Sequence, residues 1–155
     1  MTSMTTLGET TTVLEPNADW QIYERGRTMY GRTVDWHTLE GPSVVHRQGR
    51  YWLTYSGGAW TGPSYAVSWA VADAPLGPWR DSGERLLTST ADDVGPGHNS
   101  LVVTPSGDDA IVFHSWDAAR TARRMHVRGI SFEPEGPRVD GPIRGSSTGA
   151  RSVRG

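Results

Sequence analysis

The chain has 155 residues, which is long enough for one domain with a modest hydrophobic core. Its 15 basic residues, all of them arginine, nearly balance 17 acidic residues at a net charge of −2, so the composition offers no basic surface for nucleic acid. The absence of cysteine excludes disulfides, thiolate metal sites and cysteine nucleophiles.

The N-terminal residues 1–18 are predicted to be a flexible segment. Residues 1–12 are rich in threonine and lack the basic start and the apolar core of a secretory signal, which predicts a cytoplasmic chain unless a further N-terminal part changes this. No apolar run approaches the roughly 18 residues that a membrane-spanning helix needs. Residues 19–142 are predicted to form the folded domain, and the Gly-, Ser- and Arg-rich residues 143–155 a disordered tail.

Short strand-like runs, rich in β-branched and aromatic residues and bounded by Gly, Pro, Asp and Ser, follow one another along the middle of the chain. They are Val44–Val45, Tyr51–Tyr55, Tyr65–Val71, Leu101–Val103, Ile111–Phe113 and Met125–Ile130. Gln48-Gly49 and Ser106-Gly107-Asp108 are predicted hairpin turns, because glycine supplies the positive φ that tight hairpins require. No segment keeps apolar residues at helical spacing, so the sequence predicts an all-β protein with little helix.

Two copies of one pattern are present. Glu40-Gly41-Pro42 precedes the first predicted hairpin and Gly95-Pro96-Gly97-His98 the second, while Ser43 and Ser100 are 57 residues apart. Each hairpin is followed by a third strand and a weaker outer stretch, at Tyr65–Ala72 and Arg85–Thr88 in the first copy and at Ala122–Ile130 and Arg138-Val139 in the second. Four short strands per copy are typical of β-propeller blades, whose innermost strands line the axis. Glu40 and His98 are therefore predicted to occupy equivalent positions and to face one cavity from neighbouring blades.

The motifs, taken in order, are similar to those of glycoside hydrolase family 43. The matching segments are Trp36–Pro42, Gly49–Gly58, Tyr65–Val67, Ala72–Trp79, Gly95–Ser100 and Phe113–Trp116 with Arg123-Arg124. The resemblance implies a partial β-propeller of about two to three four-stranded blades, from a five-bladed architecture. It also implies hydrolysis of arabinofuranosyl or xylosyl linkages in plant oligosaccharides and polysaccharides, with inversion of configuration.

The same resemblance implies roles for particular residues. Glu40 would be the general acid, and its burial among Trp and Tyr side chains would help it to hold a proton. His98 would be the axial histidine that contacts water or an axial calcium or sodium ion; no cofactor is required. Arg123 would contact substrate hydroxyls, although the adjacent Arg124 fits the spacing equally well.

Other aromatic and histidine side chains have less specific expectations. Trp60 and Tyr65 are candidates for stacking on a sugar, with packing in the core as the alternative. His37 is a candidate for the pocket rim, whereas His46 and His126 lie in strand patterns and are expected to be structural. No His-Glu-x-x-His or comparable metal-catalysis motif is present.

One part of the family pattern is absent. Inverting hydrolysis needs a second carboxyl group to activate water, which the family supplies from an Asp-Pro context, and this sequence has no Asp-Pro dipeptide. Asp35, Asp92 and Asp93 do not fit the missing positions. The chain is thus expected to be the C-terminal half of a split or truncated gene, to assemble with another copy or a complementary propeller half, or to bind sugar without cleaving it. The leading prediction is a glycoside hydrolase that carries the general acid, and the alternative is a non-catalytic carbohydrate-binding or assembly module.

Overall fold

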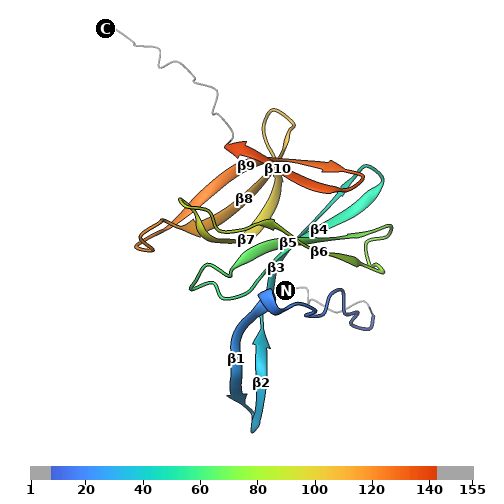
Figure 1. The fold of residues 1–155 in the computed structure, drawn as a ribbon. Helices are drawn as coiled ribbons and strands as arrows, with labels where there is room; N and C mark the ends of the chain where they lie inside the picture. Colours follow the sequence, from blue (N-terminus) through green and yellow to red (C-terminus); the bar gives the residue numbers. More distant parts are fainter. Residues whose placement is uncertain (1–7, 143–155) are drawn as a thin grey trace, which may run out of the picture.

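The computed structural model describes residues 8–142, which fold almost wholly into antiparallel strands (Figure 1). A short 3-10 turn at Asp19–Gln21 is the one helical element in this range. Within the same residues, no helix is long and apolar enough to cross a membrane. Residues 1–7 of the predicted flexible segment and the predicted tail, 143–155, lie outside the described residues.

The first blade is a four-stranded meander of β3 (Leu39–Arg47), β4 (Arg50–Gly57), β5 (Ala66–Ala72) and β6 (Arg80–Leu87). The turn between β3 and β4 is the predicted one, since Gln48 and Gly49 both have positive φ, +53° and +73°. The outer strand β6 is longer than predicted. Its sequence is mostly polar and charged, so the alternation of apolar residues that marks inner strands is missing there.

The second blade repeats this arrangement with β7 (Val94–Val103), β8 (Asp109–Trp116), β9 (Arg123–Glu133) and β10 (Gly136–Pro142). Strands β3 and β7 are the first strands of the two blades, and they lie beside each other. They are joined where the Leu101 backbone N–H donates to Ser43 Oγ at 2.9 Å. The prediction of about two to three four-stranded blades is confirmed, with two such sheets within residues 8–142.

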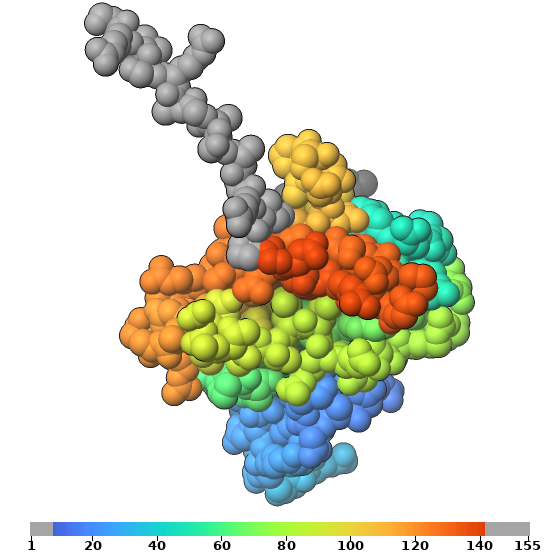
Figure 2. All heavy atoms as spheres, turned by 45° about the horizontal axis from the view of Figure 1, so that its top comes forward, coloured from blue at the N-terminus to red at the C-terminus, as the bar shows by residue number. Residues whose placement is uncertain are grey.

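A two-stranded hairpin that the sequence did not predict precedes the blades. It consists of β1 (Ile22–Met29) and β2 (Arg32–His37) and projects away from both four-stranded sheets (Figures 1 and 2). Its residues are largely exposed and many are charged, so no alternating apolar pattern marks its strands. The turn residues Tyr30 and Gly31 have positive φ, +50° and +73°, as a tight hairpin requires.

The hydrophobic core lies between the two blades. Buried residues of the first blade pack against buried residues of the second, and the cluster consists of Trp52, Val67, Val71, Leu87, Ile111, Phe113, Ile130 and Phe132. Each such side chain contributes about 1.5–3 kcal/mol when fully buried. At the rim, Arg47 of β3 forms a two-pronged ion pair with Asp109 of β8, with both N–O distances at 2.7 Å.

The outer face of the first blade is covered by other residues, whereas the second blade leaves apolar side chains exposed. Trp20 and Gln21 cover the first blade, where the Trp20 ring stacks on Tyr55 at 6.3 Å and Gln21 Nε2 donates to the Tyr55 hydroxyl. On the second blade Val102 and Met125 stay exposed, at 40% and 76%. Apolar side chains of the second blade thus remain open to solvent.

Candidate active site

Irregularities interrupt both inner strands at the same repeat position. The register of β3 shifts between Glu40 and Ser43, and the register of β7 shifts between Gly97 and Ser100. These shifts are β-bulges, which re-aim side chains and are common beside active sites. Glu40 and His98 thus lie within β3 and β7, at the bulges, rather than before the strands.

The repeat spacing corrects one expectation about these two residues. With 57 residues between copies, Glu40 corresponds to Gly97, and His98 corresponds to Gly41. Glu40 and His98 are therefore offset by one residue from equivalent positions in the two copies. Gly41 and His98 share a left-handed backbone, with φ of +58° and +49°. Such a φ is uncommon for a residue other than glycine, and side chains held in this way are concentrated at functional sites.

The two glycines at these positions lie against residues of the neighbouring blade. A Cβ atom on Gly41 would lie 3.4 Å from the Cα of His98. A Cβ atom on Gly97 would lie only 2.0 Å from Cε1 of Tyr65, whose ring fills the space beside it. Gly97 thus makes room for the Tyr65 ring, whereas Gly41 is favoured by its positive φ rather than by lack of space.

The carboxyl group of Glu40 meets one residue from each blade. The Tyr65 hydroxyl donates a hydrogen bond to Glu40 Oε1, and His98 Nδ1 lies 3.8 Å from the same oxygen. The Glu40 side chain is 32% exposed and that of His98 60% exposed, so both are open to a ligand. The predicted meeting of Glu40 and His98 from neighbouring blades is therefore observed.

Tyr65 enters the site through its hydroxyl rather than its ring. The residue is 1% exposed, which leaves no ring face for a sugar, so the expected stacking role does not fit its position. Burial, together with the hydrogen bond to the Glu40 carboxylate, raises the pKa of the Tyr65 phenol. Tyr65 consequently remains a hydrogen-bond donor at neutral pH.

The structure separates Arg123 from Arg124, which the sequence could not do. Arg123 Nη2 donates to the Trp60 carbonyl at 2.7 Å, Nη1 lies 3.4 Å from His114 Nε2, and the guanidinium lies over the Trp116 ring at 4.9 Å. Arg124 extends from the opposite face of β9, where its Nη2 lies 4.0 Å from Asp117. Arg123 is therefore the arginine on the side of Glu40 and His98.

His114 is a residue of this site that sequence reasoning missed. Its ring lies nearly parallel to the rings of Tyr65 and His98, with centroids 6.2 Å away in each case. Burial first, then the charges of Arg123 and His98, lower the pKa of His114, so this imidazole is neutral at neutral pH. The repeat offered a signal, because Gly49 and Gly107 of the two hairpin turns are 58 residues apart, and at this spacing His114 corresponds to Ser56. The Oγ of Ser56 accepts the His98 backbone N–H at 2.8 Å.

Trp60 and His37 lie further out. The Trp60 ring is half-buried and stacks on Tyr23 at 4.2 Å, and its carbonyl anchors Arg123. His37 lies on the β1–β2 hairpin, where Nδ1 is 3.1 Å from the Asp35 carbonyl. It lines a hollow of about 550 Å³ together with residues of the hairpin and with Pro16, which precedes the hairpin. The contacts found for His37 do not reach Glu40.

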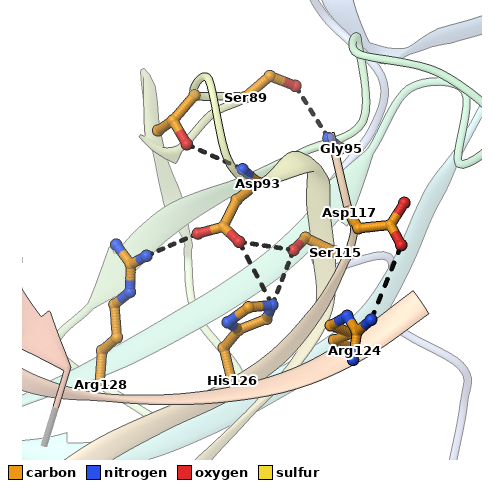
Figure 3. Close-up of polar contacts among 9 residues, drawn as sticks. Ser89, Asp93, Gly95, Ser115, Asp117, Arg124, His126 and Arg128 are labelled. Carbon is orange, nitrogen blue, oxygen red and sulfur yellow. Dashed lines mark hydrogen bonds and ion pairs between the residues drawn. The ribbon is translucent and has the colours of Figure 1, made fainter. Parts of the chain in front are cut away.

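Two of the three nearby carboxylates considered from sequence, Asp35 and Asp93, are engaged elsewhere. Asp35 is held on the hairpin by Arg25 and by the Gly26 backbone N–H. Asp93 accepts hydrogen bonds from Arg128 at 2.7 Å and from Ser115 at 3.1 Å (Figure 3). Within residues 8–142, the polar contacts that reach the Glu40 carboxyl come from Tyr65 and His98, neither of which brings a second carboxyl group.

The Ser115, His126 and Asp93 side chains in Figure 3 do not form a nucleophilic triad. Ser115 Oγ and Asp93 Oδ1 both approach the same ring nitrogen of His126, Nε2, at 2.9 and 3.4 Å. A triad instead needs the carboxylate and the hydroxyl on different ring nitrogens. Ser115 is also 1% exposed, so the group is a structural network.

A metal site is not evident in the described part of the chain. Among residues 8–142, no group of three or more His, Asp or Glu side chains is arranged to hold a metal ion. The axial calcium or sodium ion therefore stays a prediction that depends on the resemblance.

Several solved structures share this fold. The crystal structure of a thermostable family-43 glycoside hydrolase has a TM-score of 0.71 and 32% identity, covering 94% of this chain and 46% of that chain. An α-L-arabinofuranosidase from Lactobacillus brevis has a TM-score of 0.65 and 29% identity, covering 86% of this chain and 42% of that chain.

Sequence comparisons agree with the structural ones. A β-D-galactofuranosidase of Aspergillus niger is 42% identical over 92 residues, which cover 57% of this chain and 26% of that protein. An extracellular exo-α-(1→5)-L-arabinofuranosidase of Streptomyces chartreusis is 33% identical over 108 residues, covering 64% of this chain and 29% of that protein. The chain thus spans between about a quarter and about a half of the length of these relatives. The family described as Glycosyl hydrolases family 43 matches residues 3–136, and the chain belongs to this family.

Proposed function

We propose that this chain carries the acid side of a glycoside hydrolase site that acts on arabinofuranosyl or xylosyl linkages, with Glu40 as the general acid. The observation that carries the proposal is the convergence of Glu40, Tyr65 and His98 at the bulges of two neighbouring blades. The arabinofuranosidases among the relatives support a pentose as substrate.

The surroundings of Glu40 suit a general acid. The side chain is two-thirds buried yet still reachable, which allows it to approach a glycosidic oxygen while most bulk water is excluded. General acid catalysis of this kind contributes typically about 10²–10⁴-fold to a rate. Arg123 and His98 lie at the edge of the same site with exposed polar atoms, and we assign them to the binding of sugar hydroxyls.

The proposed reaction is inverting. It requires a second carboxyl group about 6.5–9.5 Å from the first, because a water molecule must fit between the base and the sugar. Asp35 and Asp93 are held by other partners, so we assign neither of them to this role. The sequence also has no Asp-Pro dipeptide, so the alternative is a chain that binds the sugar and does not cleave it.

Hydrolysis assays on the purified chain test the proposal. Release of 4-nitrophenol from aryl α-L-arabinofuranoside and aryl β-xyloside is measured for the wild type, for Glu40→Gln and for Glu84→Gln, an exposed control on β6. Turnover that Glu40→Gln alone abolishes supports the proposal, and NMR of the newly released anomer reports inversion. Absence of turnover together with calorimetric binding of a pentose oligosaccharide would favour the binding module. Absence of both would overturn the two readings.

Substitutions of the neighbouring residues Arg123 and Arg124 supply a second test variant with its control. Arg123→Ala is expected to raise KM or to weaken oligosaccharide binding at least about tenfold, because a hydrogen bond to a charged group is worth roughly 1.5–3 kcal/mol. Arg124→Ala, on the opposite face of β9, is expected to match the wild type. Equal effects of the two substitutions would contradict the assignment of Arg123 to the site.

A further inference from the structure

The hydroxyl of Tyr65 approaches Glu40 from a fully packed position. The residue is 1% exposed, and its ring occupies the space that the missing side chain of Gly97 leaves free. The ring of His114 lies 6.2 Å away and nearly parallel, with an interplanar angle of 14°. The direction of the Tyr65 O–H is therefore set by the packing of the two blades and not by solvent.

The contacts of Glu40 fall on one of its two oxygens. Oε1 accepts the hydrogen bond from Tyr65 and also lies 3.8 Å from His98 Nδ1. Within residues 8–142, the one hydrogen bond to this carboxyl group is the one on Oε1, and none reaches Oε2. The two oxygens of this carboxyl group are consequently not equivalent.

We propose that Tyr65 is a positioning residue, which confines the transferable proton of Glu40 to Oε2; this inference rests on the proposed function. A phenol that donates to Oε1 makes this oxygen the carbonyl oxygen of the neutral acid, since an O–H group at the same place would face another donor. The proton must then lie on Oε2, the oxygen that accepts no hydrogen bond within the described residues. Tyr65 thereby determines which oxygen of Glu40 delivers the proton.

The chemical step follows from this assignment. The proton leaves Oε2 for the glycosidic oxygen, which also keeps the electron pair of the breaking bond to the anomeric carbon. A water molecule forms the new bond at that carbon and gives its proton to the second carboxyl group that an inverting mechanism requires. Glu40 becomes a carboxylate.

Tyr65 continues to donate as this charge develops. Its phenol keeps its proton at neutral pH, because burial and the neighbouring Glu40 raise its pKa. A hydrogen bond to a carboxylate is stronger than one to a neutral acid. The contact therefore stabilises the transition state more than the starting state, which is the condition for accelerating the reaction.

Tyr55 provides a matched control on the adjacent strand. It is 2% exposed, and its hydroxyl donates to a carboxylate oxygen of Asp81 at 2.9 Å, on the outer face of the same blade. Tyr65→Phe and Tyr55→Phe therefore each remove one buried phenol that donates to a carboxylate. Only Tyr65 contacts Glu40.

The kinetic test compares two leaving groups on the sugar that the wild type hydrolyses. The 2,4-dinitrophenolate leaving group departs without protonation, whereas an alkoxide leaving group needs a proton from the general acid. We expect Tyr65→Phe to lower kcat/KM about tenfold or more for the alkyl glycoside and less than about twofold for the dinitrophenyl glycoside. Tyr55→Phe should change kcat/KM by the same factor for both glycosides. An equal loss on both substrates in Tyr65→Phe would show a merely structural role and overturn the inference.

A spectroscopic test is independent of turnover. The ¹³Cζ resonance of Tyr65, identified by its loss in Tyr65→Phe, should show an inflection in a pH titration, and this inflection should vanish in Glu40→Gln. The same titration of Tyr65 in the wild type and in Glu40→Gln would overturn the inference. If the wild type hydrolyses neither sugar, the proposed function fails and the NMR result alone decides for or against the Tyr65 contact.

Discussion

Replacing Gly97 by alanine tests whether the slot for Tyr65 holds the blades and the acid together. The new Cβ would lie 2.0 Å from Tyr65 Cε1, 2.5 Å from Cδ1 and 2.7 Å from Cζ, whereas real Cβ atoms essentially never approach within 3.0 Å. The ring must therefore move by at least about 1 Å in a densely packed interior. Because Tyr65 is 1% exposed, this movement displaces other buried groups and draws the hydroxyl away from Glu40.

The size of the effect follows from these two losses. Overpacking of a core costs typically about 1–3 kcal/mol. Loss of a hydrogen bond to a charged group costs about 1.5–3 kcal/mol. We expect Gly97→Ala to lower the free energy of unfolding by about 3–5 kcal/mol, which corresponds to a fall in Tm of roughly 10 °C for a chain of this size.

Urea unfolding followed by tryptophan fluorescence measures the change. Gly62→Ala is the control, because a Cβ there meets nothing within 4 Å and the backbone φ is not positive. It should stay within about 1 kcal/mol of the wild type, as is usual for substitutions away from special features. If Gly97→Ala unfolds at the same urea concentration as Gly62→Ala, the reasoning about the slot is refuted.

Three further predictions concern stability. Burial raises the pKa of the Tyr55 phenol from 10.0 to about 12, so its contribution to the free energy of unfolding is complete below pH 10 and is lost as the pH rises towards 12. The free energy of unfolding of Tyr55→Phe should therefore vary less with pH over this window than that of the wild type, and an identical pH dependence of the two proteins would contradict the prediction. The lowered pKa of His114 means that the unfolded chain takes up this proton first, so the wild type should lose stability as the pH falls below about 6.5, and His114→Gln should lose less in acid unfolding curves. A double-mutant cycle with Arg47→Met and Asp109→Asn should give a coupling of about 1 kcal/mol for this half-buried two-pronged pair, and a coupling near zero would show that the pair does not tie the blades together.

Much of the blade architecture could be predicted from local patterns. The inner strands of both blades alternate or run apolar over short stretches, and Gln48-Gly49 marks a tight turn, so their pairing follows from neighbouring residues. The repeat of 57 residues then identified equivalent strands. The β1–β2 hairpin could not be found in this way, because its stability comes from contacts such as that between Tyr23 and Trp60, which are distant in sequence.

The candidate site was predicted in part. The motifs led to Glu40 and His98, and the structure brings these two side chains together. The 57-residue spacing of the repeat also showed that Glu40 and His98 are offset by one residue, so that each corresponds to a glycine in the other copy. The roles of Tyr65 and His114 were not visible, because an aromatic ring or an imidazole within a strand pattern has no signature that separates core packing from a polar contact.

Amino-acid order was sufficient for the all-β class and for the two blades, since these depend on residues that are neighbours or recur at a fixed spacing. The family and the candidate acid Glu40 came from the resemblance of several ordered motifs to family 43. Which face of one blade meets which face of the next was decided by tertiary packing alone. That packing directs Tyr65 onto Glu40 and places Arg123, rather than Arg124, on the side of the site. The physical reason is that strand alternation assigns a side chain to one face of its sheet, while the partner that it meets there comes from a different strand, loop or blade.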